Sequence, residues 1–103
     1  MKFQIKEEDL KKGYVNISFV SDNEIQELNK KYRNKDYATD VLSFDIHEHT
    51  EDGKYYIGDV VVNIDQAKRQ AADYGNNLEQ EISELAGHGI LHLLGIHHEH
   101  DDE

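Results

Sequence analysis

The chain has 103 residues, the size of one domain, and carries 22 acidic against 11 basic side chains, a net charge of −11. It has no cysteine, which excludes disulfides and thiolate metal ligands, and no apolar run approaches the roughly 20 residues of a membrane span. The N-terminus lacks the apolar region of a signal peptide. We therefore expect a single domain over residues 1–103, located in the cytoplasm, with no membrane partner.

Alternation of apolar and polar side chains predicts strands over residues 2–6 and 14–20. Ser21 and Glu24 then have the spacing of a capping box, which predicts a helix that ends near residue 33. Basic residues concentrate over 30–35, at the end of this helix. They allow a local positive patch, although the acidic charge of the whole chain argues against a broad nucleic-acid surface.

Residues 39–46 and 55–64 are the third and fourth predicted strands, joined by a polar hairpin loop over 47–54. Val60–Val62 are apolar on both faces of the last strand, which is typical of a central position in a sheet. The order of elements predicts an α+β fold, with helices packed on a single mixed four-stranded sheet around one core.

Two helices follow the last strand. Asn63 or Asp65 can cap a helix over 66–74, and Gly75 ends it. Asn77 with Gln80 then resembles a capping pair that opens a second helix at residue 78. Its C-terminal half is apolar nearly all round, which predicts that this half is buried.

Three histidines stand around the end of this last helix. His88 and His92 are four residues apart and share one face of a helix, and Gly95 is placed to end the helix before His98. Three imidazoles arranged in this way suit one divalent ion of the zinc type, with a fourth position open. Other divalent transition metals also bind such nitrogen ligands.

The spacing of these histidines is that of the metzincin zinc proteases, so the site is metzincin-like. In those enzymes a glutamate that acts as general base follows the first histidine, and here Gly89 takes its place. The pattern therefore indicates a metal site without the chemistry of peptide cleavage. Gly89 also costs about 1 kcal/mol in a helix interior. Either Gly89 allows close approach of another segment or of a substrate, or it is a tolerated packing glycine.

Four segments in order resemble the bacterial YbeY endoribonuclease family, the rRNA maturation factors. They are Leu28–Arg33, Thr39–Phe44, Ile57–Val61 and the histidine motif from His88 to Glu99. The resemblance runs from about residue 14 to residue 100. It implies a zinc-dependent single-strand endoribonuclease that acts in 16S rRNA 3′-end maturation and ribosome quality control. Its partners would then be the 16S rRNA precursor and the small ribosomal subunit.

The resemblance also implies roles for individual residues. His88, His92 and His98 are carried over as the ligands of one zinc ion, Arg33 as a contact to substrate phosphate, and Asp59 as a supporting residue. Both of the last two have structural alternatives. Arg33 can complement the dipole of its helix, and Asp59 can be an ordinary hydrogen-bonded strand residue.

The chain departs from the family pattern at three points. His97 stands where the family has an aspartate before the third histidine, which leaves His97 and His98 as alternative ligands, with the spacing in favour of His98. The segment between the first two predicted strands is short where the family usually has a helix. The chain also stops soon after the motif, so we expect either a minimal or a truncated member of the family.

RNA carries its own nucleophile in the 2′-hydroxyl, so cleavage needs no glutamate from the protein. The sequence leaves open whether this hydroxyl or water attacks. Two alternative functions remain: a metal-dependent hydrolase of peptides or other small substrates, and a non-catalytic ribosome assembly factor. The other histidines, His47, His49 and His100, are predicted to be solvated. The sequence does not indicate an oligomeric state.

Overall fold

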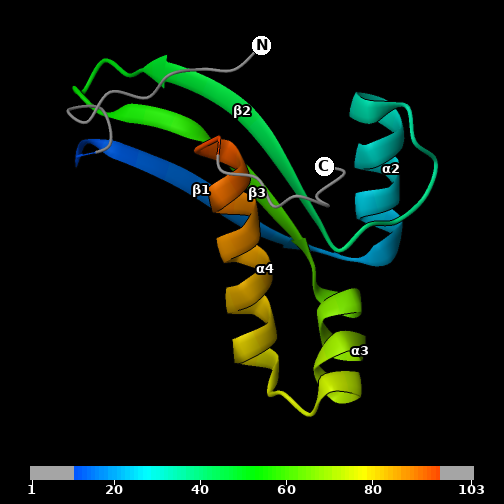
Figure 1. Ribbon diagram of the computed structural model, residues 1–103. Coiled ribbons are helices and arrows are strands. Elements are labelled where there is room, and N and C mark those ends of the chain that lie inside the picture. Colours follow the sequence, from blue (N-terminus) through cyan, green and yellow to red (C-terminus); the bar gives the residue numbers. More distant parts are fainter. Residues whose placement is uncertain (1–10, 96–103) are drawn as a thin grey trace.

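The computed structural model describes residues 11–95, which form three strands and three helices (Figure 1). In chain order these elements are β1 (Gly13–Val20), α2 (Asp22–Arg33), β2 (Val41–His49), β3 (Tyr55–Asn63), α3 (Ile64–Tyr74) and α4 (Leu78–Leu93). The predicted α+β class is confirmed. The predicted four-stranded sheet is corrected to three strands within the described residues, because the strand expected over 2–6 falls outside them.

The sheet has the strand order β1-β3-β2. β1 pairs with β3 in parallel and β2 pairs with β3 in antiparallel, so the sheet is mixed as predicted. β3 is the central strand, which confirms the inference from Val60–Val62. Val60 and Val62 are fully buried on one face, and Val61 is buried in a separate apolar cluster on the other.

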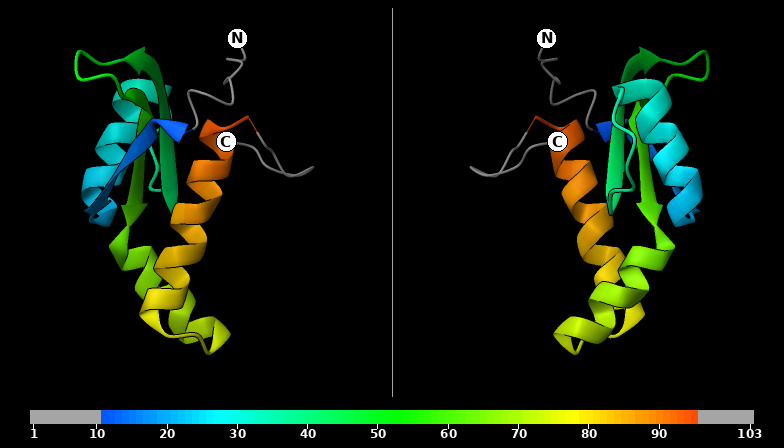
Figure 2. Two further views of the ribbon diagram at one scale, coloured as in Figure 1. Left: turned by 90° about the vertical axis from the view of Figure 1, so that its left-hand side faces the viewer. Right: turned by 90° about the vertical axis from the view of Figure 1, so that its right-hand side faces the viewer.

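Helices cover both faces of the sheet. Figure 2 shows α2 on one side and α4, with α3 beside it, on the other. On the α2 side, Ile25 packs in a small cluster with Leu42 and Val61. On the α4 side, the main core joins Leu85 and Leu93 of α4 to side chains of β2, β3 and α3. The sheet therefore separates the side chains of α2 from those of α4.

Capping residues set the ends of the helices as the sequence predicts. Both bonds of a capping box are present at Ser21 with Glu24 and at Asn77 with Gln80. Asn63 is the cap of α3, which begins at residue 64 and ends at Gly75, in the left-handed conformation at φ 69°. Glycine adopts this conformation without the steric cost of a side chain.

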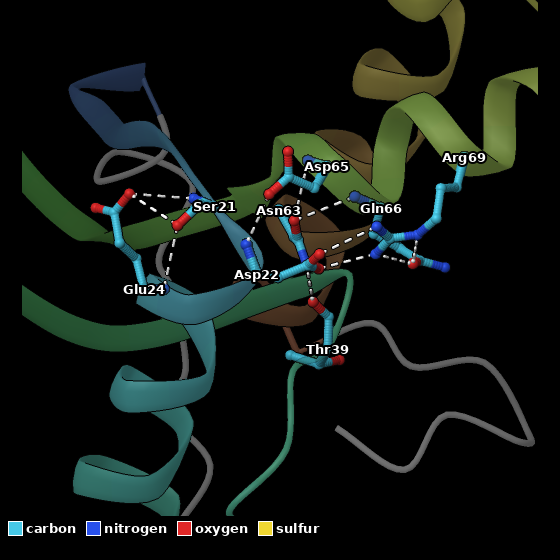
Figure 3. A network of polar contacts seen from close by, with 8 residues as sticks. All are labelled: Ser21, Asp22, Glu24, Thr39, Asn63, Asp65, Gln66 and Arg69. Atoms are coloured by element: carbon cyan, nitrogen blue, oxygen red, sulfur yellow. Dashed lines mark hydrogen bonds and ion pairs between the residues drawn. The ribbon is translucent and has the colours of Figure 1, made fainter.

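A polar network joins the starts of α2 and α3 (Figure 3). Asn63 is almost fully buried, and its side-chain amide donates to Asp22 at 2.7 Å and to the carbonyl of Thr39 at 3.1 Å. Arg69 of α3 donates two hydrogen bonds to the carboxylate of Asp22, at 2.8 and 3.0 Å. The hydrogen bonds to Asp22 hold its pKa below the usual value, and those from Arg69 have the largest effect.

Strand β2 is longer than predicted, because it runs on to His49 through an irregularity between Asp45 and Glu48. His47 lies within this irregularity with φ at 54°, in the left-handed region. Beyond it, Glu48 and His49 pair with Tyr56 and Tyr55 of β3. The hairpin loop therefore covers only residues 50–54.

The last helix is less buried than its composition predicts. Leu85, Gly89 and Leu93 are buried against the sheet, which confirms the predicted apolar face. Leu91 is 37% exposed, so the prediction of burial all round is wrong. In the part of the chain that the structure describes, the sheet covers α4 from one side only. No helix in residues 11–95 is long and apolar enough to cross a membrane.

Candidate metal centre and its surroundings

Two of the three predicted ligands lie in the described part of the chain. His88 and His92 stand one turn apart on α4, His88 exposed and His92 half-buried with its Nε2 atom shielded from solvent. The helix ends at Leu93, and Gly95 follows with φ at 81°, as the predicted turn requires. His97 and His98 lie outside the described residues. Within residues 11–95 no three histidine, cysteine or acidic side chains form a group that could hold a metal.

Gly89 lies between the two histidines and faces the sheet. A methyl group added there would lie 2.7 Å from Cγ1 of Val60, closer than real contacts of this kind. The helix backbone therefore approaches β3 to a distance that only glycine permits. Close approach of another segment, one of the explanations given for Gly89, is confirmed. Its carbonyl also accepts a hydrogen bond of 3.3 Å from Oγ of Ser43 on β2.

The structure does not bring Arg33 or Asp59 to the histidines. Arg33 is the last residue of α2, which lies across the sheet from α4 (Figure 2). Asp59 lies in β3 and lines a groove on the α2 side of the sheet, together with Tyr32. The sequence places these residues in one functional group by resemblance. The fold separates them into two faces.

The groove beside Asp59 has a volume of about 700 Å³. Its walls come from α2 and all three strands: Asn16, Ile17, Ser18, Leu28, Tyr32, Phe44, Ile46, Tyr56, Asp59 and Val61. The Tyr56 hydroxyl donates a hydrogen bond to the carboxylate of Asp59 and accepts one from Asn16 at 3.2 Å. The bond to Asp59, followed by burial, raises the pKa of Tyr56 above its usual value. Tyr14 stacks on Tyr56 with ring centroids 5.1 Å apart.

The prediction that His47 is solvated is wrong, since its side chain is 2% exposed. Its ring nitrogens lie 3.0 Å from the Tyr55 hydroxyl and 3.0 Å from a carboxylate oxygen of Asp45. The irregularity in β2 turns this side chain inward. His49 is exposed as predicted, with its ring centroid 4.8 Å from that of Tyr55. His100 lies outside the described residues.

A family model described as Endoribonuclease YbeY matches residues 1–103, the whole chain. The chain belongs to the YbeY family. The resemblance drawn from the four segments is thereby confirmed, and it extends over more of the chain than those segments indicate.

Individual YbeY relatives agree with this assignment. Three proteins named Endoribonuclease YbeY are similar to this chain: those of Acholeplasma laidlawii, 48% identical over 87 residues; Caldanaerobacter subterraneus, 44% over 109; and Oceanobacillus iheyensis, 42% over 97. These matches cover 84, 95 and 86% of this chain and 61, 69 and 63% of the respective relatives. The chain therefore spans about two thirds of the length of these relatives.

A solved structure has a similar fold. It is the solution structure of TM1509 from Thermotoga maritima, 36% identical, with a TM-score of 0.57. The match covers 93% of this chain and 61% of the other. The arrangement of strands and helices in this chain thus has an experimental counterpart.

Proposed function

We propose that this protein is a metal-dependent endoribonuclease that cleaves single-stranded RNA. In this proposal it takes part in 16S rRNA 3′-end maturation and ribosome quality control in the cytoplasm, with the rRNA precursor and the small subunit as partners. The observation that carries the proposal is the match of the whole chain to the YbeY family, whose relatives are named endoribonucleases.

The residues present fit a zinc ion. Two imidazoles on successive turns of one helix are a usual pair of zinc ligands, and the shielding of the His92 Nε2 atom favours a ligand held away from water. His98 completes the proposed set from the segment beyond Gly95. When bound, a divalent ion supplies Lewis-acid polarisation of a phosphoryl oxygen.

The glycine at position 89 favours RNA over peptide as the substrate. It faces Val60, and the chain has no glutamate directly after His88, which is the position of the general base in the metzincin pattern. A peptide bond would need that base, whereas RNA brings its own 2′-hydroxyl close to the phosphorus. The absence of a side chain at this position therefore supports phosphodiester cleavage over proteolysis.

Arg33 and Asp59 act away from the bond that is cleaved, in this proposal. The sheet lies between them and α4, so Arg33 would anchor a phosphate several nucleotides from the cleavage point. Asp59, hydrogen-bonded to Tyr56, would support the adjoining groove.

Replacement of one ligand tests the proposal. His92→Ala should lose the bound metal and reduce RNA cleavage to background, because two imidazoles hold a divalent ion far more weakly than three. Elemental analysis of untagged protein and cleavage of a single-stranded RNA before and after chelation measure the two effects.

Glu79→Ala, an exposed change in the first turn of the same helix, is the matched control and should keep both metal and activity. Full cleavage by the His92→Ala protein, with metal shown to be absent, would refute the proposal.

A further inference from the structure

The turn of α4 that carries the two histidines is seated on the sheet by two tight contacts. Gly89 lies over Val60, where an added methyl would also come within 3.3 Å of Val41. One turn later, Leu93 lies over Gly58 of β3, and a methyl on Gly58 would lie 2.9 Å from Cδ2 of Leu93. In both contacts a glycine on one element receives a side chain of the other.

These contacts fix how far α4 stands from the sheet, and the side chain of Leu93 over Gly58 holds the end of the helix. Gly89 itself has no side chain that could hold its turn against rotation about the helix axis. The hydrogen bond from Ser43 to the Gly89 carbonyl is directional, and it reaches the helix from the neighbouring strand β2. It therefore adds a restraint on the rotation of this turn.

A small rotation matters at the imidazoles. Side chains reach about 5–6 Å from a helix axis, so a roll of about 10° displaces a side-chain tip by about 1 Å. Ligand distances in a metal site are held to about 0.2 Å. Gly89 directly follows His88 and precedes His92 by three residues, so a restraint on its carbonyl acts on the turn that bears both ligands.

We propose that Ser43 is a positioning residue for the metal site, and that it acts through the backbone of Gly89. The hydroxyl of Ser43 sets the rotation of the turn of α4 that carries His88 and His92, and with it the direction of both imidazoles. The inference rests on the metal site of the proposed function and adds a residue outside the ligand set. Ser43 does not touch metal or substrate in this account.

Cobalt binding to the metal-free protein tests this role, because the visible absorption of Co²⁺ reports both affinity and ligand geometry. Ser43→Ala should weaken Co²⁺ binding by about two- to three-fold, the effect of one long and therefore weak hydrogen bond, and should broaden the absorption bands. Ser43→Thr keeps the hydroxyl and should restore most of the affinity.

The matched control is Ser18→Ala, an exposed serine of β1 on the groove side of the sheet, which should bind Co²⁺ like the unaltered protein. Thermal unfolding of the metal-free variants separates positioning from stability. A purely structural role for Ser43 would lower the melting temperature and leave affinity and spectrum unchanged, and that result would overturn the proposal.

A second pair of variants tests the contact between Gly89 of α4 and Val60 of β3. Gly89→Ala should bind Co²⁺ more weakly than Ser43→Ala, since its methyl collides with Val60 and moves the helix. Val60→Ala in the same chain removes the colliding atoms and should recover part of the affinity. If the double variant binds Co²⁺ no more tightly than Gly89→Ala alone, the contact between Gly89 and Val60 does not position the histidines. If the unaltered protein binds no Co²⁺, the proposed function fails and this inference fails with it. If the unaltered protein binds Co²⁺ and Ser43→Ala binds it with the same affinity and spectrum, only this inference is rejected.

Discussion

At the scale of single residues, Tyr56 and Asp59 form a titratable pair in the groove. The hydrogen bond to Asp59 raises the pKa of Tyr56 above its ordinary value of 10.0, so folding favours the protonated phenol. A group of this kind contributes stability that is complete below pH 10 and is lost as the pH rises through the folded pKa.

Asp59→Asn should therefore bring the pKa of Tyr56 back toward 10.0 and reduce the loss of unfolding free energy as the pH rises above 10.0. NMR titration of the Tyr56 ring, with urea unfolding below and above pH 10.0, measures the two quantities. A Tyr56 titration that does not move in the variant would show that Asp59 is not the cause.

Sequence patterns predict the type of a residue more readily than its partners. The motif marks His88 and His92, and Gly89 is marked as a point of close approach because its cost in a helix needs a compensating contact. The position of His47 could not be predicted, because its burial depends on an irregularity in β2 that alternation does not reveal.

At the scale of elements, two asparagines occupy the same position and differ in their surroundings. Asn77 caps α4 from an exposed position, and Asn63 caps α3 while buried between Asp22 and Thr39. Asn77→Ala should cost about 1 kcal/mol of unfolding free energy, the usual loss of a cap. Asn63→Ala should cost about 2 kcal/mol, because it also removes the hydrogen bonds from a buried amide to Asp22 and to the Thr39 carbonyl.

Urea unfolding of the two variants compares these costs directly, and each is the control for the other. Equal losses would mean that the buried network adds nothing beyond capping. Caps of this kind are the most predictable part of the fold, since side chain and helix start lie within three residues of each other. The extent of β2 was not predictable, because it is decided by pairing with β3.

At the scale of the whole molecule, the sheet divides the predicted site. Local patterns determine that α2 and α4 are helices with one apolar side each. They do not determine which face of the sheet each helix covers, because that depends on the path of the chain between strands. The family resemblance names Arg33, Asp59 and the histidines together, and only the three-dimensional arrangement shows that α2 and α4 lie on opposite faces (Figure 2).

This division makes the role of Arg33 depend on the length of the substrate. A strand cleaved beside α4 reaches α2 only by passing around the sheet, so Arg33→Ala should weaken binding of an RNA of about ten nucleotides by about ten-fold. It should leave cleavage of a dinucleotide and the affinity for metal unchanged. Lys68→Ala, an exposed change on α3, is the charge-matched control. KM and kcat measured on both substrates test this prediction. If Arg33→Ala reduced kcat/KM equally on the dinucleotide and on the longer RNA, Arg33 would act at the reacting phosphate. That result would contradict the separation of α2 from α4 by the sheet.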